Sequence, residues 1–272
     1  MITIDDPNDP RLDDYRHLTD AAARRAIESA GAAHGIFIAE GPVALEQLYA
    51  STLTIRSVLM TPSRAASLPP PPPGVAIHLA TRAVLATAAG YDVHRGVLAA
   101  AERPAPSDPE DVVAGARRVL VLEAVSDNEN VGSLFRNAAA MGIDALLLDR
   151  SCTDPFYRRS IRVSSGWSMR LPHARVTDTS QALAVLHDRG FHTVALTPQA
   201  QATPVDIAAG RGHLDDPVAF VVGAEGPGLD PSSIAACRSV VRIPMRPGVD
   251  SLNVATSLGV IAAFAAARRG WT

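Results

Sequence analysis

The chain has 272 residues, 47% of them hydrophobic, and a formal charge of −3, which together are typical of a globular protein with room for two domains. All 25 basic residues are arginine. The absence of lysine excludes a GxxxxGK[ST] phosphate loop, a Schiff-base catalyst and a pyridoxal phosphate anchor. The two cysteines lie far apart and the eight histidines lack ligand spacing, so neither a disulfide framework nor a metal site is predicted. With no apolar run long enough to span a bilayer and no leader-like start, a cytoplasmic protein is expected.

The first third of the chain alternates helix and strand signals at the spacing of a small α/β domain. The predicted elements are a helix over 19–33, a strand over 35–39, a helix over 43–51, and strands over 57–60, 75–79 and 96–99. The proline run 69–73 is expected to be an extended surface connection. We therefore assign residues 1–101 to a first domain and the proline-rich, acidic stretch 102–116 to a linker.

From residue 117 onward the alternation is cleaner. Strands are predicted over 119–123, 145–148, 193–196, 219–222 and 240–243, with helices over 131–141, 181–188 and 254–269. The strands are unbroken apolar runs, as expected for a parallel sheet covered on both faces. The last helix is apolar nearly all round and is expected to be buried. Residues 117–272 are therefore predicted to form a doubly wound α/β domain with a ligand crevice at the strand ends.

The first strand of this domain leads into the segment DNENVGSLFR. Asn130 is a plausible cap for the helix that follows, and capping alone would account for it. Arg136 is expected to lean back towards the helix N-terminus, where an arginine is unfavourable unless an anionic partner compensates. The strand–helix–strand unit ending at Asp149 imitates a dinucleotide-binding fold. The GxGxxG fingerprint, however, is missing from this junction.

Two later junctions carry the remaining candidates. The loop GAEGPG suits an uncharged or cationic ligand better than a phosphate, because Pro227 donates no amide hydrogen. Its Glu225 either bonds to neighbouring amides or acts beside an arginine. Ser251 and Asn253 stand two residues apart before the last helix, so one is expected to cap that helix while the other faces the crevice.

Taken together, the stretches NENVGSLFRNAAAMG, FVVGAEGPGL and IPMRPGVDSLNVATSLGV resemble the SpoU/TrmH family of S-adenosylmethionine-dependent RNA ribose methyltransferases, in the SPOUT superfamily. The intervening TDPFYRRSIRVSSGWSMRLP is similar to the family's connecting segment. More weakly, FIAEGPVALEQL resembles its small RNA-binding domain of ribosomal-protein type. The resemblance implies a trefoil-knotted C-terminal α/β domain with a parallel sheet, a homodimer, and S-adenosylmethionine bound in the knot without a metal.

The resemblance also assigns residues. The implied cofactor contacts are Thr197, Gly223, Ile243, Met245 and Leu252, and the implied catalytic positions are Arg136, Asn130, Glu225, Ser251 and Asn253. An RNA-binding surface is expected at Arg158, Arg159 and Arg162, beside two stackable rings, although such a cluster is also typical of an ordinary solvated face. In a dimer this surface could serve the partner's site. In similar enzymes the first-motif arginine is proposed as a general base. Phosphate binding with stabilisation of the forming alkoxide is the alternative for Arg136.

The implied reaction is methyl transfer to a ribose 2′-hydroxyl of RNA, with ribosomal RNA as the first candidate and transfer RNA as the alternative. The chain departs from the common motif at Asn128, Glu129 and Asn137, which bears on substrate identity more than on chemistry. A non-catalytic RNA-binding or ribosome-assembly factor is the alternative from another class. A nicotinamide-dependent oxidoreductase is disfavoured by the missing fingerprint.

Overall fold

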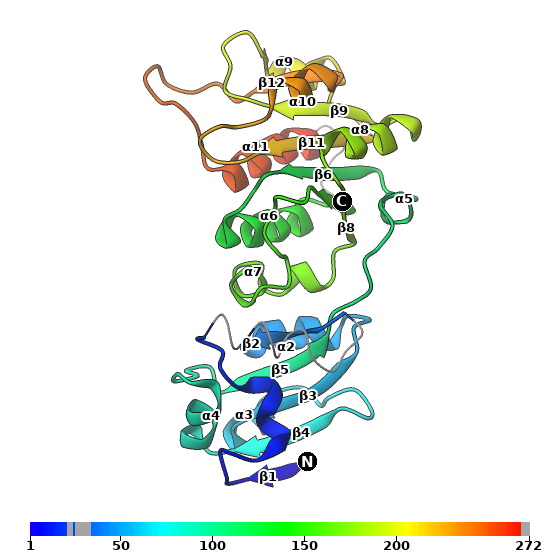
Figure 1. Ribbon diagram of the computed structural model, residues 1–272. Coiled ribbons are helices and arrows are strands. Elements are labelled where there is room, and N and C mark those ends of the chain that lie inside the picture. The colour runs from blue at the N-terminus through cyan, green and yellow to red at the C-terminus, as the bar shows by residue number, and fades with distance from the viewer. Residues whose placement is uncertain (21–23, 25–33, 268–272) are drawn as a thin grey trace. The chain divides into compact units, whose positions relative to one another are not determined.

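The computed structural model describes residues 1–20, 24 and 34–267, so most of the helix predicted over 19–33 lies outside the described residues. The chain divides into two compact units (Figure 1). The first comprises Met1–Ala105 and Pro155–Arg170, and the second Pro106–Asp154 and Leu171–Thr272. The stretch 155–170, which the sequence pattern places in the second domain, packs with the first unit instead. Its Phe156, Ile161 and Met169 are buried in the core of that unit.

The first unit is built on a five-stranded mixed sheet in the order β1–β4–β3–β5–β2. The strands are β1 (Ile2–Ile4), β2 (Ile36–Glu40), β3 (Ile55–Met60), β4 (Ala76–Ala80) and β5 (Val97–Glu102). One face is covered by η1 (Pro10–Tyr15) and α4 (Arg82–Ala89), and the other by α2 (Pro42–Tyr49), α3 (Pro62–Ala65), α7 (Arg158–Val163) and η2 (Trp167–Met169). The four predicted strands are confirmed, whereas the three-residue β1 is too short to leave a pattern.

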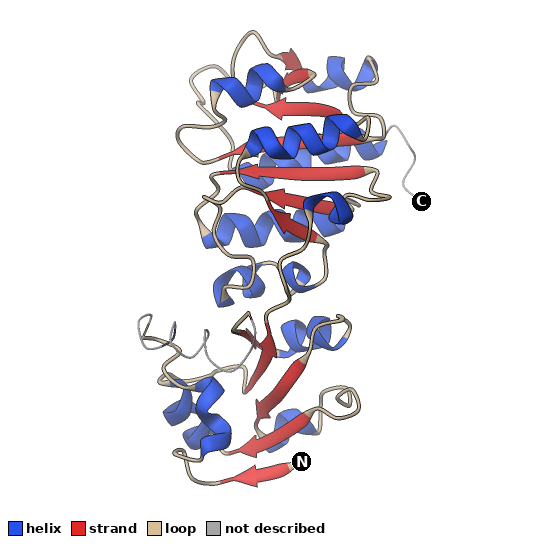
Figure 2. Ribbon diagram, turned by 45° about the vertical axis from the view of Figure 1, so that its right-hand side comes forward, coloured by secondary structure: helices blue, strands red, loops and turns tan. Residues whose placement is uncertain are grey.

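The second unit is built on a seven-stranded, all-parallel sheet in the order β10–β12–β9–β11–β6–β7–β8. The strands are β6 (Arg118–Glu123), β7 (Ala145–Leu148), β8 (His173–Arg175), β9 (His192–Leu196), β10 (Thr203–Pro204), β11 (Val218–Gly223) and β12 (Ser239–Arg242). Helices α6 (Asn128–Ala140), α9 (Val205–Gly210) and α11 (Val254–Ala267) cover one face, and α5 (Pro109–Val112), α8 (Thr179–Asp188) and α10 (Pro231–Ala236) the other (Figure 2). The predicted parallel α/β architecture is confirmed.

Helix α11 differs from its prediction in burial. Leu258 and Ile261 are fully buried against the sheet and α6, but Phe264 on the outer side of the helix is 37% exposed. The all-round apolar pattern predicts burial on every side, whereas within the described residues one face of α11 has no neighbour to cover it. Separately, no described helix combines the length and the apolar character needed to cross a bilayer.

Candidate active site

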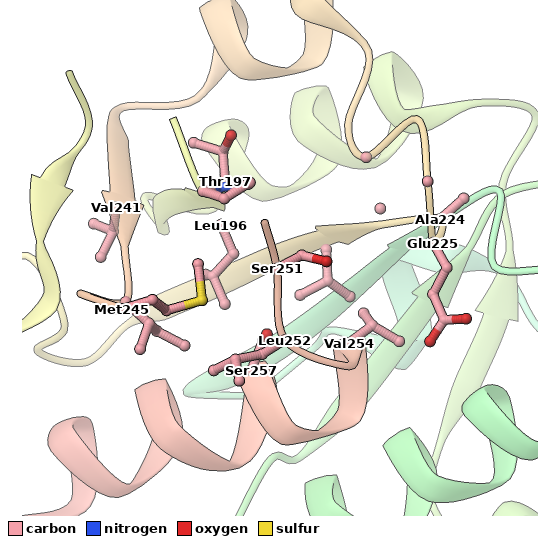
Figure 3. Close-up of a pocket in the computed structure, with 16 residues that line it drawn as sticks. Leu196, Thr197, Ala224, Glu225, Val241, Met245, Ser251, Leu252, Val254 and Ser257 are labelled. Carbon is pink, nitrogen blue, oxygen red and sulfur yellow. The ribbon is translucent and has the colours of Figure 1, made fainter. Parts of the chain in front are cut away.

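A pocket lies in the second unit where three adjacent parallel strands, β9, β11 and β12, reach their carboxyl ends (Figure 3). All five residues predicted to contact a cofactor line it: Thr197, Gly223, Ile243, Met245 and Leu252. Two of the predicted catalytic residues, Glu225 and Ser251, also line it. The sheet thus brings together side chains from segments more than fifty residues apart, as expected at the carboxyl ends of parallel strands.

The lining of this pocket is mostly apolar. Leu196, Val222, Val241 and Val254 form its walls, and the backbone of the glycine-rich loop forms one rim. Among the described residues that line it, Glu225 carries the only formal charge and no side chain is basic. A pocket of this kind favours a neutral or cationic ligand over one that carries several phosphates.

The rim loop needs glycine at its first position because the chain folds back tightly on itself. A Cβ atom at Gly223 would lie 2.6 Å from the backbone nitrogen of Leu229, closer than real side chains approach. The amide of Gly228 donates to the carbonyl of Ala224 at 3.1 Å and closes the turn. Gly226, within the turn, has φ +89°, in the region that favours glycine. The loop is therefore a preformed rim whose backbone faces the pocket.

Asn253 caps α11 and also reaches into the site. Its Oδ1 accepts hydrogen bonds from the amides of Ala255 at 2.9 Å and Thr256 at 3.3 Å, which confirms that one of the two candidate residues caps this helix. Its Nδ2 donates to Glu225 Oε1 and to Asn130 Oδ1, both at 2.9 Å. The two amide donors to Oδ1 leave one consistent orientation of the side chain. One residue thus joins the helix start to two other polar groups of the site.

Asn130 does not cap α6, which corrects the interpretation of it as a helix cap. The helix begins three residues earlier than predicted, and the cap is Asp127, whose Oδ1 accepts from the amides of Glu129 at 2.8 Å and Asn130 at 2.9 Å. The Asn130 side chain is buried and accepts from Asn253 instead. Sequence reasoning missed Asp127 because three residues with capping side chains, Asp127, Asn128 and Asn130, stand within four positions.

The remaining catalytic candidates are placed differently. Ser251 lines the pocket, whereas Arg136 is exposed on α6 and does not line it. Arg136 makes no hydrogen bond or ion pair with any residue that the structure describes. The next residue, Asn137, faces α11 and donates to the carbonyl of Ala255 at 2.7 Å, so Arg136 lies about 100° further round the helix. Ser257, one turn after Asn253, also lines the pocket and was missed; its helical spacing from Asn253 is the signal that points to it.

Two buried carboxylates near the strand ends hold turns. Asp149, the residue that imitates a ribose-binding acid, accepts from the amides of Ala124, Ser151 and Cys152. Glu123 accepts from the amide of Asp230 and so anchors the start of α10. The other oxygen of Glu123 accepts from the Ser233 hydroxyl, so both carboxylates are bonded to groups of their own domain.

The three arginines predicted to bind RNA lie on α7 in the first unit and line a second hollow with Glu40 and Tyr157. Arg158 is engaged internally, since it donates to the Tyr91 hydroxyl at 2.9 Å and to the Leu18 carbonyl at 2.8 Å. Arg159 and Arg162 are exposed.

The comparisons with known proteins agree with this geometry. A model of the SpoU rRNA Methylase family matches residues 117–263. An uncharacterized tRNA/rRNA methyltransferase of Mycobacterium tuberculosis is 42% identical over 255 residues, which cover 93% of this chain and 87% of that protein. The 23S rRNA (guanosine-2′-O-)-methyltransferase of Vibrio parahaemolyticus is 31% identical over 192 residues, 69% of this chain and 76% of that protein.

Among solved structures, an AdoMet-bound rRNA methyltransferase from Sinorhizobium meliloti superposes with a TM-score of 0.79 at 22% identity, over 100% of this chain and 99% of that one. The fold of the whole chain is therefore that of this solved structure. The family is shown separately, by the sequence matches. This chain belongs to the SpoU rRNA methylase family.

Proposed function

We propose that this protein transfers a methyl group from S-adenosylmethionine to a ribose 2′-hydroxyl of RNA in the cytoplasm, with ribosomal RNA as the substrate. The observation that carries the proposal is the pocket at the ends of β9, β11 and β12, whose apolar walls meet the hydrogen-bonded group of Asn130, Glu225 and Asn253. The 23S rRNA 2′-O-methyltransferase relative supports the choice of ribose and of ribosomal RNA. Transfer RNA is the alternative substrate.

The residues of the pocket fit S-adenosylmethionine. When bound, this cofactor supplies an electrophilic methyl group from a positively charged sulfonium. The walls suit its apolar parts, and the backbone beside Gly223, Ile243 and Leu252 supplies acceptors and donors for its polar edges. The negative charge of Glu225 favours the positively charged sulfonium of this cofactor. A dinucleotide would need donors for its pyrophosphate that this lining lacks, which argues against the oxidoreductase alternative.

On the ribose side, Glu225 is the acceptor that the geometry favours. Its Oε1 is held by Asn253, and its second carboxylate oxygen makes no hydrogen bond with any described residue. That oxygen is available to accept the proton of the 2′-hydroxyl, a role that contributes about 10²–10⁴-fold to rate. Ser251, also on the lining, would orient the hydroxyl, and Asn130 would hold Asn253 in place.

Arg136 would act on the RNA. Because arginine side chains are cations in proteins, we assign Arg136 to the phosphate beside the target ribose and to the developing negative charge, in place of proton removal. Its exposed position, away from the lining of its own chain's pocket, suits a group that meets a large ligand or the site of a second protomer. Arg159 and Arg162, with Tyr157 beside them, are proposed as a separate RNA contact.

We also propose that the protein is a homodimer and that its second unit has the family's trefoil knot. The uncovered side of α11, with Phe264 exposed, supports the dimer, because an apolar helix face of this kind favours a partner. The place of β11 between β9 and β6, neither of which directly precedes or follows it in the sequence, supports the non-sequential threading. Light scattering of Phe264→Asp should then report a monomer where the unaltered protein is a dimer, and two separately inactive variants should regain activity when mixed.

The decisive experiment incubates the protein with labelled S-adenosylmethionine and unmodified total RNA, and maps alkali-resistant linkages. Label in ribosomal RNA at an alkali-resistant step is the expected result. Label confined to transfer RNA would select the alternative substrate. Cofactor binding by calorimetry without RNA labelling under any condition would favour the non-catalytic assembly factor.

A further inference from the structure

A second pocket in the first unit lies outside the site described above. It is formed by η1 together with the beginnings of β3 and β4. The polar side chains that matter in it are Arg11, Asp14, Arg56, Ser57 and His78. Nothing in the proposed chemistry uses these residues.

His78 is the unusual member. It is 6% exposed, its Nδ1 is sealed from solvent, and neither ring nitrogen bonds to any residue that the structure describes. A sealed nitrogen without a partner is less costly as a lone pair than as an N–H, so we assign the proton to Nε2. Burial, and after it the Arg11 guanidinium, lowers the pKa of His78, which keeps the ring neutral at pH 7. His78 thus offers the pocket one N–H donor.

Ser57 provides a second polar group. Its hydroxyl is buried and lies 2.7 Å from the hydroxyl of Tyr15, which leaves further hydrogen-bonding capacity on the serine oxygen. Because Tyr15 is fully buried, it fixes the position of Ser57 at the floor of the pocket. The floor therefore carries two fixed polar groups from adjacent strands, Ser57 on β3 and His78 on β4.

The charges around this pocket are already balanced. Each charged side chain of the lining is paired: Arg11 with Asp9, Arg56 with Asp14, and Asp13 with Arg16. A phosphate would have to compete with a carboxylate for each guanidinium. A neutral group that both donates and accepts needs no such displacement. It can meet the donors of the floor and the remaining lone pairs of Asp14, while the flat Arg11 guanidinium offers a stacking surface.

We propose that this pocket holds one unpaired base of the RNA substrate and selects a base with a carbonyl beside a ring N–H, as in uracil and guanine. The inference rests on the proposed function only in taking RNA as the substrate. The carbonyl accepts from His78 and Ser57, and the ring N–H donates to Asp14. Adenine has no carbonyl and fits poorly. The pocket therefore gives the first unit a means of reading RNA sequence, in addition to contacts with its backbone.

The test is direct binding of the full chain to two fluorescent 12-nucleotide RNAs, one of uridine and one of adenosine, followed by anisotropy. The unaltered protein should bind the uridine RNA about tenfold more tightly, the difference expected for one or two hydrogen bonds. His78→Phe should lose that preference. His78→Gln, whose amide nitrogen can stand near the position of Nε2, should keep most of it. Should His78→Phe fail to fold, Ser57→Ala replaces it, with an expected loss of about fivefold.

Equal binding of both RNAs by the unaltered protein would overturn the proposal, as would a preference that survives His78→Phe or Ser57→Ala. Free uridine at millimolar concentration is the second arm: because it presents the same base, it should lower binding of the uridine RNA towards that of the adenosine RNA. Calorimetric binding of free uridine that His78→Phe abolishes, with no preference between the two RNAs, would mean that the pocket serves a free nucleoside and that the RNA proposal is wrong. Calorimetric binding of S-adenosylmethionine and the melting temperature report the fold of each variant. Anisotropy measures binding and requires no turnover. A protein that prefers the uridine RNA but transfers no methyl group would therefore contradict the proposed function and still support this inference.

Discussion

Two helices of the second unit, α6 and α11, begin beside the active-site polar group, and their caps differ in chemistry. Asp127 caps α6 with a carboxylate, and Asn253 caps α11 with an amide. A carboxylate only accepts hydrogen bonds, whereas an amide has an acceptor and two donors. Asn253 can therefore hold its helix through Oδ1 and hold Glu225 and Asn130 through Nδ2. Asn253 therefore both caps α11 and takes part in the active site. The hydrogen bonds of Asp127 show only capping among the described residues.

The largest effect on methyl transfer is expected from Asn253→Asp, which gives α11 a carboxylate cap like the one on α6. The new carboxylate can still accept from the amides of Ala255 and Thr256, so the cap itself should persist, while repulsion from Glu225 and the loss of the donor to Asn130 should lower the free energy of unfolding by about 1–3 kcal/mol. Both donors are lost and a negative charge faces Glu225, so methyl transfer should fall by about 100-fold or more. Initial rates with labelled cofactor measure the activity, and calorimetry measures the stability.

Asn253→Ala is the matched control, because it removes the cap and the donors together. We expect a loss of about 1 kcal/mol in stability with a similar loss of activity. If the aspartate variant instead transferred methyl groups at nearly the original rate per folded molecule, the amide of Asn253 would serve only as a cap.

Glu225→Gln should have the next largest effect. The glutamine oxygen can still accept from Asn253, so the network around the cap persists while the charge and the proton acceptor are lost. The rate should fall by about 10²-fold, at the lower end for a lost general base, with little change in melting temperature. A rate that stays near the original at every pH would assign proton removal to another group. A rate loss accompanied by a large drop in melting temperature would make Glu225 a structural partner of the cap.

These residues also show where sequence reasoning succeeds. The strands at the site are short and mostly apolar, and the parallel sheet follows from that pattern. The cap at Asn253 is predictable because a polar pair directly precedes an apolar helix. The start of α6 is not, since Asn128 and Asn130 are weak helix formers and local propensity places the start at Val131. The structure extends the helix back to Asn128, because the Asp127 carboxylate satisfies the first amides.

Contacts between distant segments are the part that the sequence pattern cannot supply. The bond from Asn253 to Asn130 joins residues 123 positions apart, and only the sheet order brings them together. The same holds for residues 155–170, whose buried Phe156 packs at a tilt against Phe37 of the first unit, with 4.9 Å between the ring centroids. Short edge strands such as β10 contain too few residues to show a recognisable alternation of apolar and polar positions.

A smaller effect is expected from Asn137→Ala. The substitution removes the hydrogen bond from Nδ2 to the carbonyl of Ala255 and so loosens α6 from the first turn of α11. Stability should fall by about 0.5–1.5 kcal/mol. Because the cap bonds of Asn253 remain, we expect only a severalfold fall in methyl transfer. Asn137→Gln, with the same amide on a longer side chain, tests whether the position of the bond matters. Full activity in both variants would show that the first turn of α11 is held without this contact.

The smallest effect on activity is expected at the first cap. Asp127→Ala should destabilise the protein by about 1 kcal/mol, because the amides of Glu129 and Asn130 lose their acceptor, whereas Asp127→Asn should restore most of that loss. Methyl transfer per folded molecule should be unchanged in both, since no bond runs from Asp127 to Glu225 or Asn253 among the described residues. A rate loss in Asp127→Ala that matches that of Asn253→Asp would mean that the start of α6 positions Asn130 for the reaction. The two caps would then differ in their functional group but not in their role. The starts of both helices would belong to the active site.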